Sequence, residues 1–115
     1  MHEHPIYPPS SQELSQHRRE LAPEIEKAFR DFSRVVFADG ALPRKVKQLI
    51  AVAVAHTTQC PYCIRGHTTG ALRDGATEAE IMEAIWVAAE MRAGGAFAHA
   101  TVAVAAMREE RGGQR

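Results

Sequence analysis

The feature that most restricts the fold of this 115-residue chain is the apolar segment over residues 44–57. Val46, Leu49, Ile50 and Ala53 recur there at three- and four-residue steps, which is the spacing of one helical face. Valines and alanines fill much of the remaining surface, so this helix is apolar nearly all round and requires burial on more than one side. A domain of this size can hardly enclose it alone. We therefore expect another subunit to cover part of it.

The rest of the chain also shows helical patterns. A first helix is expected from Ser10 or Ser11 to about Phe37, bent at Pro23. A helix opening at Pro61 is closed by the glycine of residues 73–75. The capping-box pattern of residues 77–80 starts another helix, Gly94-Gly95 is expected to interrupt it, and a last helix should cover residues 96–108.

These elements predict an all-α, alanine-rich bundle of about five to six helices that is oligomeric. The apolar runs are alanine-rich and lack period-two alternation, so strands are not expected. Residues 1–115 are taken as a single domain. Within it, residues 1–9 form an extended arm because prolines fix the backbone, and residues 111–115 form a frayed tail.

Composition excludes several classes of partner. Fourteen basic and fourteen acidic residues leave a formal charge of zero, which argues against nucleic acid or an anionic membrane surface as a partner. No apolar stretch is long and uncharged enough to span a bilayer. The first ten residues carry no apolar run of the kind a secretory signal needs. The expected location is therefore the cytoplasm, where a C-x-x-C pair is more often catalytic, redox-sensing or metal-binding than a structural disulfide.

The two cysteines of the chain form one motif, Cys60-Pro61-Tyr62-Cys63, with His67 four residues further on. Pro61 suits the first turn of a helix, which places Cys60 at or beside the N-cap and Cys63 at the third helical position. Unpaired backbone N–H groups and the helix dipole stabilise a thiolate there. His67 shares a helical face with Cys63, so its imidazole can accept the thiol proton or pass a proton to a leaving group.

Such a pair supports peroxide chemistry. A thiolate that attacks a peroxide becomes a sulfenic acid, and the neighbouring thiol condenses with it to give a disulfide and water. The same residues also suit a thiol-disulfide reductase without peroxide chemistry. A third alternative is a zinc-stabilised helical module with His56, Cys60, Cys63 and His67 as ligands, and a fourth is simply two small buried residues beside a helix start.

Residues 48–55 followed by the C-x-x-C-x-x-x-H element of residues 60–67 resemble the core signature of the carboxymuconolactone decarboxylase superfamily, in its alkyl hydroperoxidase D-like branch. The resemblance covers about residues 40–107. It implies an all-helical fold, a homo-trimer or hexamer, and a cysteine pair that serves as a peroxidase or disulfide-reductase centre. By position, Cys63 resembles the peroxide-attacking cysteine, Cys60 the resolving cysteine and His67 the relay histidine.

The sequence departs from this pattern at Gln48. The family's usual glutamate, twelve residues before the first cysteine, falls on Gln48, which can hydrogen-bond but cannot take a proton at ordinary pH. Substitutes for the proton relay are Glu83, Glu90, His56 or a water molecule. Glu83 and Glu90 are seven residues apart and so share one face of their helix.

The sequence thus predicts an alkylhydroperoxidase-like thiol oxidoreductase that reduces an organic or hydrogen peroxide through a dithiol/disulfide cycle. An external thiol or dithiol reductant is expected to regenerate it. No flavin, haem or nucleotide motif occurs in the sequence, so no cofactor is expected. The ligands of the alternative zinc site would all come from twelve consecutive residues, whereas structural zinc usually joins separate segments, so no metal is expected either.

Overall fold

The computed structural model describes residues 6–9 and 11–113, and within these ranges it contains five helices and no strand. The all-α prediction is therefore confirmed. The helices are α1 (Gln12–Leu21), α2 (Pro23–Val36), α3 (Arg44–Thr58), α4 (Pro61–Arg73) and α5 (Glu78–Gly113). Of the expected N-terminal arm, residues 6–9 are non-helical, and residues 1–5 and Ser10 lie outside the described residues.

The expected first helix is two helices. The Ser11 hydroxyl caps α1 by accepting a hydrogen bond from the backbone N–H of Leu14 at 3.2 Å. Ala22 then leaves the helical region, with φ −153° and ψ 70°, because the ring of Pro23 disfavours a helical conformation in the residue before it. Pro23 starts α2 at a position where its missing N–H removes no helical bond. The effect of Pro23 is thus a break and not a bend.

Helices α3, α4 and the first part of α5 pack together and hold the core. Its buried members are Val52 of α3, Ala71 of α4, Ala76 of the connection and Ile81 of α5. Gly75 has φ +95°, a conformation that only glycine adopts readily, and it turns the chain from α4 toward α5. The predicted glycine closure of the motif helix is confirmed.

Helix α5 begins as predicted and continues where a break was expected. The backbone N–H of Glu80 donates to the Thr77 hydroxyl at 3.0 Å and the Glu80 carboxylate accepts from the Thr77 N–H at 2.9 Å, which is a capping box. The helix then runs through Gly94-Gly95 to Gly113, so the predicted break and the frayed tail over residues 111–113 are wrong. Each glycine weakens a helix by about 1 kcal/mol, but the alanine-rich segments on both sides propagate it; residues 114–115 lie outside the described part.

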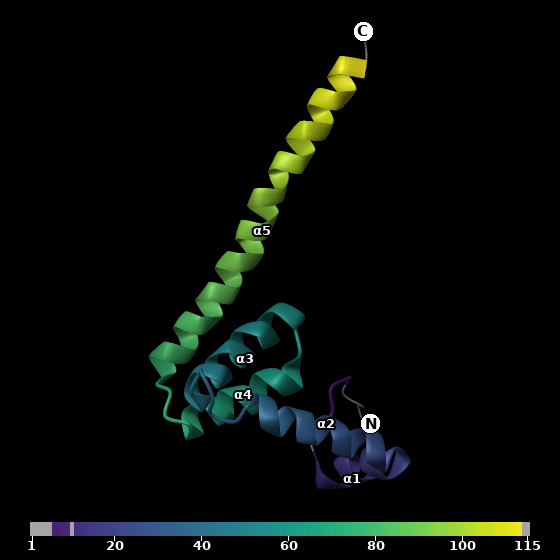
Figure 1. The fold of residues 1–115 in the computed structure, drawn as a ribbon, viewed down its shortest axis with the longest axis vertical. Helices are drawn as coiled ribbons and strands as arrows, with labels where there is room; N and C mark the ends of the chain where they lie inside the picture. Colours follow the sequence, from purple (N-terminus) through teal and green to yellow (C-terminus); the bar gives the residue numbers. More distant parts are fainter. Residues whose placement is uncertain (1–5, 10, 114–115) are drawn as a thin grey trace, which may run out of the picture.

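The chain is far more extended than a compact domain. Its radius of gyration is 20.5 Å, whereas a compact chain of this length has about 13 Å. Figure 1 shows the reason: α5 leaves the α3–α4 pair and projects alone to the C-terminus. Every residue from 96 to 113 is exposed, including Phe97 at 84% and Val102 at 65%. In the described residues no helix combines the length and apolar character needed to cross a membrane.

Candidate active site

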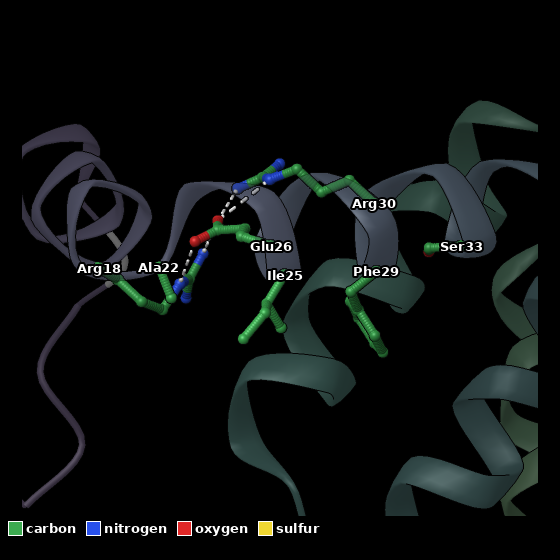
Figure 2. Close-up of a pocket in the computed structure, with 7 residues that line it drawn as sticks. All are labelled: Arg18, Ala22, Ile25, Glu26, Phe29, Arg30 and Ser33. Atoms are coloured by element: carbon green, nitrogen blue, oxygen red, sulfur yellow. Dashed lines mark hydrogen bonds and ion pairs between the residues drawn. The ribbon is translucent and has the colours of Figure 1, made fainter.

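A groove between α1 and α2 offers space but little chemistry. It measures about 640 Å³, and its carboxylate, Glu26, accepts hydrogen bonds from Arg18 and Arg30. These bonds lower the pKa of Glu26. Figure 2 shows that the side chains of Ile25 and Phe29 extend from the side of α2 opposite to that of Glu26 and Arg30. In the part of the chain that the structure describes, no cysteine or histidine lines this groove, so the candidate site is sought elsewhere.

The turn between α3 and α4 places the cysteine pair. Gln59 caps the end of α3 in the left-handed conformation, with φ 58°, and Cys60 follows as the N-cap of α4. Its sulfur accepts a hydrogen bond from the backbone N–H of Cys63 at 3.3 Å, and Pro61 occupies the first turn. The local structure predicted for the motif is confirmed. Both cysteines are free and half-buried.

The pKa values of the two cysteines are shifted in opposite directions. Their sulfurs lie 2.6 Å apart, so the Cys63 thiol can donate to an ionised Cys60. This bond lowers the pKa of Cys60, and the backbone N–H groups of Cys63 and Tyr62 lower it further. The same contact raises the pKa of Cys63, and burial and the Cys60 charge act in the same direction. In the reduced pair, the first proton to leave is therefore that of Cys60.

Gln48 orients the histidine of the motif. Its side-chain oxygen lies 2.8 Å from Nδ1 of His67, so Nδ1 carries the proton and donates it to this acceptor. Gln48 is only 8% exposed. Its amide also lies directly over Gly70, where an added Cβ would come within 2.9 Å of it. A neutral His67 thus keeps its Nε2 lone pair available for a proton.

Phe37 covers one face of the His67 imidazole. Its ring stacks on His67 with centroids 4.9 Å apart and planes inclined by 21°. Lys47 holds this end of α2, because its ammonium donates to the carbonyl oxygens of Val36 at 2.8 Å and of Ala38 at 2.6 Å. Sequence reasoning missed Phe37, Lys47 and Gly70. Only Gly70 carried a signal, as a glycine inside a helical pattern that often marks a close approach.

Cys63 and His67 face the same hollow, and Cys60 does not line it. The hollow has a volume of about 370 Å³, and most of its wall is aliphatic or aromatic. Its lining residues are Val36, Phe37, Lys47, Ile50, Ala51, Val54, Ala55, Thr58, Cys63 and His67. The arrangement provides a sulfur, a proton-accepting nitrogen and an apolar surface at one place.

The structure brings Gln48, Cys60, Cys63 and His67 together and leaves the other relay candidates apart. Glu83 and Glu90 are exposed on α5 and do not line the hollow. His56 is bound through Nδ1 to the Val52 carbonyl of its own helix at 2.7 Å. Over residues 6–9 and 11–113, no three His, Cys, Asp or Glu side chains are placed to share a metal ion. The alternative zinc set with His56 is therefore not assembled.

Comparison with known proteins points to one family. Residues 23–106 match the model of the carboxymuconolactone decarboxylase family. An uncharacterised protein of the cox locus of Paracoccus denitrificans is 67% identical over 85 residues, which cover 74% of this chain and 77% of that protein. The crystal structure of a protein from Methanobacterium thermoautotrophicum is 40% identical in sequence and has a TM-score of 0.68. The matched region covers 72% of this chain and 93% of that protein's chain.

A Thermotoga maritima member of the family has a suggested role in the antioxidative response. It is 29% identical, with a TM-score of 0.56 over 75% of this chain and 89% of its own.

The acidities of the two sulfurs predict a stepwise thiol titration. Followed by thiolate absorbance, the reduced protein should lose one proton below and one above the usual range of a cysteine. Cys63→Ala should raise the pKa of Cys60, because it removes the main donor to the thiolate. Cys63→Ser should raise it less, because the hydroxyl still donates. A Cys60 titration that is identical in the wild type and in Cys63→Ala would contradict the assignment.

Proposed function

The chain belongs to the carboxymuconolactone decarboxylase family, and within it we propose that the chain is a dithiol peroxidase that reduces an organic hydroperoxide. The observation that supports this most is that Cys63 and His67 line one hollow, while the Cys60 sulfur lies 2.6 Å from the Cys63 sulfur. A nucleophile, a proton carrier and a resolving thiol are the three groups that the reaction needs. The suggested antioxidative role of the Thermotoga relative agrees with it.

The reaction proceeds in two steps. The Cys60 thiolate, which is hydrogen-bonded to Cys63, takes the Cys63 proton, and the Cys63 thiolate attacks the terminal peroxide oxygen. The O–O bond breaks, and the alcohol leaves with a proton. Cys60 then loses its proton and attacks the sulfur of the Cys63 sulfenic acid, which releases water and closes the disulfide. Overall, two thiols and one hydroperoxide give one disulfide, one alcohol and one water.

His67 carries the protons. Its Nδ1 is engaged with Gln48, so Nε2 accepts a proton from a thiol and returns it to the alkoxide or hydroxide that leaves. Gln48 takes no proton and acts as a positioning residue. Glu83, Glu90 and His56 do not line the hollow, so in this proposal His67 passes its proton to the leaving group or to solvent.

The walls of the hollow favour an organic substrate over hydrogen peroxide. Ile50, Ala51 and Val54 of α3 face it together with Val36 and Phe37. Burying an alkyl or aryl group there removes apolar surface from water, at about 25 cal/mol per Å². Hydrogen peroxide has no such group to bury.

A thiol-disulfide reductase is the second candidate function, and the acidity of Cys60 favours it. A thiolate formed at a lowered pKa on a half-exposed N-cap is suited to attack a disulfide. Peroxide consumption distinguishes the two activities.

We also propose that the protein is a homo-trimer or hexamer. The exposed apolar residues of α5, among them Trp86 and Phe97 at 68% and 84% exposure, have no cover within the described chain. Exposed apolar surface on this scale indicates an interface. Sedimentation should give three or six times the chain mass of 12.6 kDa. Phe97→Glu should dissociate the assembly, whereas Glu109→Gln, exposed on the same helix, should not; a monomeric wild type would contradict the proposal.

The peroxidase activity is tested by anaerobic titration of the reduced protein with cumene hydroperoxide. One equivalent should convert both free thiols to a disulfide, and the intact mass should fall by two hydrogens. Cys60→Ser should still consume one equivalent, more slowly because only His67 is left to accept the Cys63 proton, and stop at the sulfenic acid. Cys63→Ser should consume none. Thiols that survive the titration would refute the peroxidase proposal, and a reactive Cys63→Ser would reverse the roles of the two cysteines.

Gln48→Glu tests the positioning role. A carboxylate against Nδ1 favours the imidazolium form of His67, so an NMR titration should show the ring protonated to higher pH than in the wild type. The pH profile of peroxide consumption should shift in the same direction. Gln48→Leu removes the acceptor and should release the ring orientation without adding charge. If all three proteins gave the same His67 spectrum and the same pH profile, the contact would have no role in positioning.

A further inference from the structure

A second hollow beside the cysteine motif remains unexplained by the peroxidase site. It has a volume of about 1080 Å³ and lies between the N-terminal residues 7–9 and α4. Its lining includes Tyr7, Pro8, Tyr62, Arg65, Thr69 and Arg73, and it shares no residue with the hollow that contains Cys63 and His67. Residues 61 and 62, which directly follow Cys60, form one end of it. We refer to it as the arm groove.

The two walls of the arm groove, the N-terminal residues and α4, contact each other directly. The Tyr62 hydroxyl donates to the carbonyl oxygen of Pro8 at 2.9 Å, and the rings of Tyr7 and Tyr62 meet edge to face with centroids 6.1 Å apart. Along α4 the lining extends from Pro61 to Arg73, which is about 18 Å at 1.5 Å per residue. This length suits an extended peptide segment better than a small thiol.

The charge of the arm groove is positive. Arg65 and Arg73 are exposed, and eight residues apart they lie on one face of α4. Neither forms an ion pair with a carboxylate in residues 6–9 and 11–113, whereas Arg18 and Arg30 of α1 and α2 do. Among residues 6–9 and 11–113, no Asp or Glu lines the groove. Tyrosine and arginine are also the residues enriched at protein interfaces.

We propose that the arm groove docks an acidic, extended segment of a dithiol-bearing protein, which reduces the disulfide by attacking Cys60. This inference rests on the proposed function, because it names the partner that regenerates the site. It also separates the two substrates: the hydroperoxide meets Cys63 in the apolar hollow, and the reductant meets Cys60 from the arm groove.

The exchange transfers two electrons from the partner dithiol to the Cys60–Cys63 disulfide. A partner thiolate attacks the Cys60 sulfur, the Cys60–Cys63 bond breaks, and Cys63 leaves and is protonated. The second partner thiol loses its proton and attacks the partner sulfur of the mixed disulfide, which releases Cys60. The partner dithiol is oxidised to a disulfide and the two cysteines are reduced. Cys60 is a good leaving group in the second step because its pKa is lowered.

The test measures reduction of the oxidised protein, with the disulfide formed by diamide so that no peroxidase activity is required. The probes are a synthetic two-cysteine peptide flanked by aspartates and glutamates, the same peptide flanked by serines, and dithiothreitol. At an ionic strength of about 0.01 M the acidic peptide should react about tenfold faster than the serine peptide. This advantage should vanish at about 1 M.

Charge-reversed variants locate the effect. Arg65→Glu/Arg73→Glu should remove the advantage of the acidic peptide and leave reduction by dithiothreitol unchanged. Arg108→Glu/Arg111→Glu, exposed on α5, alters the net charge equally and should keep the advantage. Equal rates for both peptides on the wild type, or equal losses in both double variants, would overturn the docking proposal. Either result would leave the peroxide reaction of Cys63 untouched, so the two proposals fail separately.

Discussion

The buried amide of Gln48 is the contact on which the arrangement of the site depends. It lies between α3 and α4, where leaving it without a partner would cost about 1–3 kcal/mol, and the imidazole of His67 satisfies it. Gly70 lets the amide approach α4, because any side chain there would collide with it. Folding of the α3–α4 pair therefore fixes the ring and its tautomer together. Phe37, held through Lys47, stacks on the ring that Gln48 has oriented.

This arrangement gives the two sulfurs different surroundings. Cys60 is the N-cap of α4 and has the lower pKa of the pair, because both a thiol and backbone N–H groups donate to it. Cys63 has the higher pKa and faces the apolar hollow with His67. The more acidic sulfur is thus not the one that faces the space for a substrate. In our proposal Cys60 first acts as the base for Cys63, then resolves the sulfenic acid, and finally receives the reductant.

Local chemistry made much of this predictable from sequence. Proline at the first turn, the spacing of the cysteines and His67, and the capping box of residues 77–80 each depend on neighbours within one or two turns, and all three appear as expected. The partnership of Gln48 with His67 spans nineteen residues, and the family resemblance indicated the position of Gln48 but not its contact. Phe37 and Lys47 act across helices, and no periodicity indicates such contacts.

The errors have a physical cause as well. Gly94-Gly95 lowers helix propensity without ending the helix, because propensity differences of about 1 kcal/mol are small against propagation through long alanine-rich flanks. Pro23 had a larger effect than expected because it restricts the residue before it as well as itself. Because a break was expected at Gly94-Gly95, the sequence did not predict the full exposed length of α5. The need for a partner subunit was predicted from the apolar composition of α3 instead.

The most direct test of the central claim is to trap the first product in the Cys60→Ser variant. After one equivalent of cumene hydroperoxide, dimedone labels a sulfenic acid, and peptide mass spectrometry locates the label. The account predicts one adduct, on Cys63, and none on the Cys63→Ser protein treated in the same way. An adduct on Cys60 in the Cys63→Ser protein, or none in either variant, would contradict it.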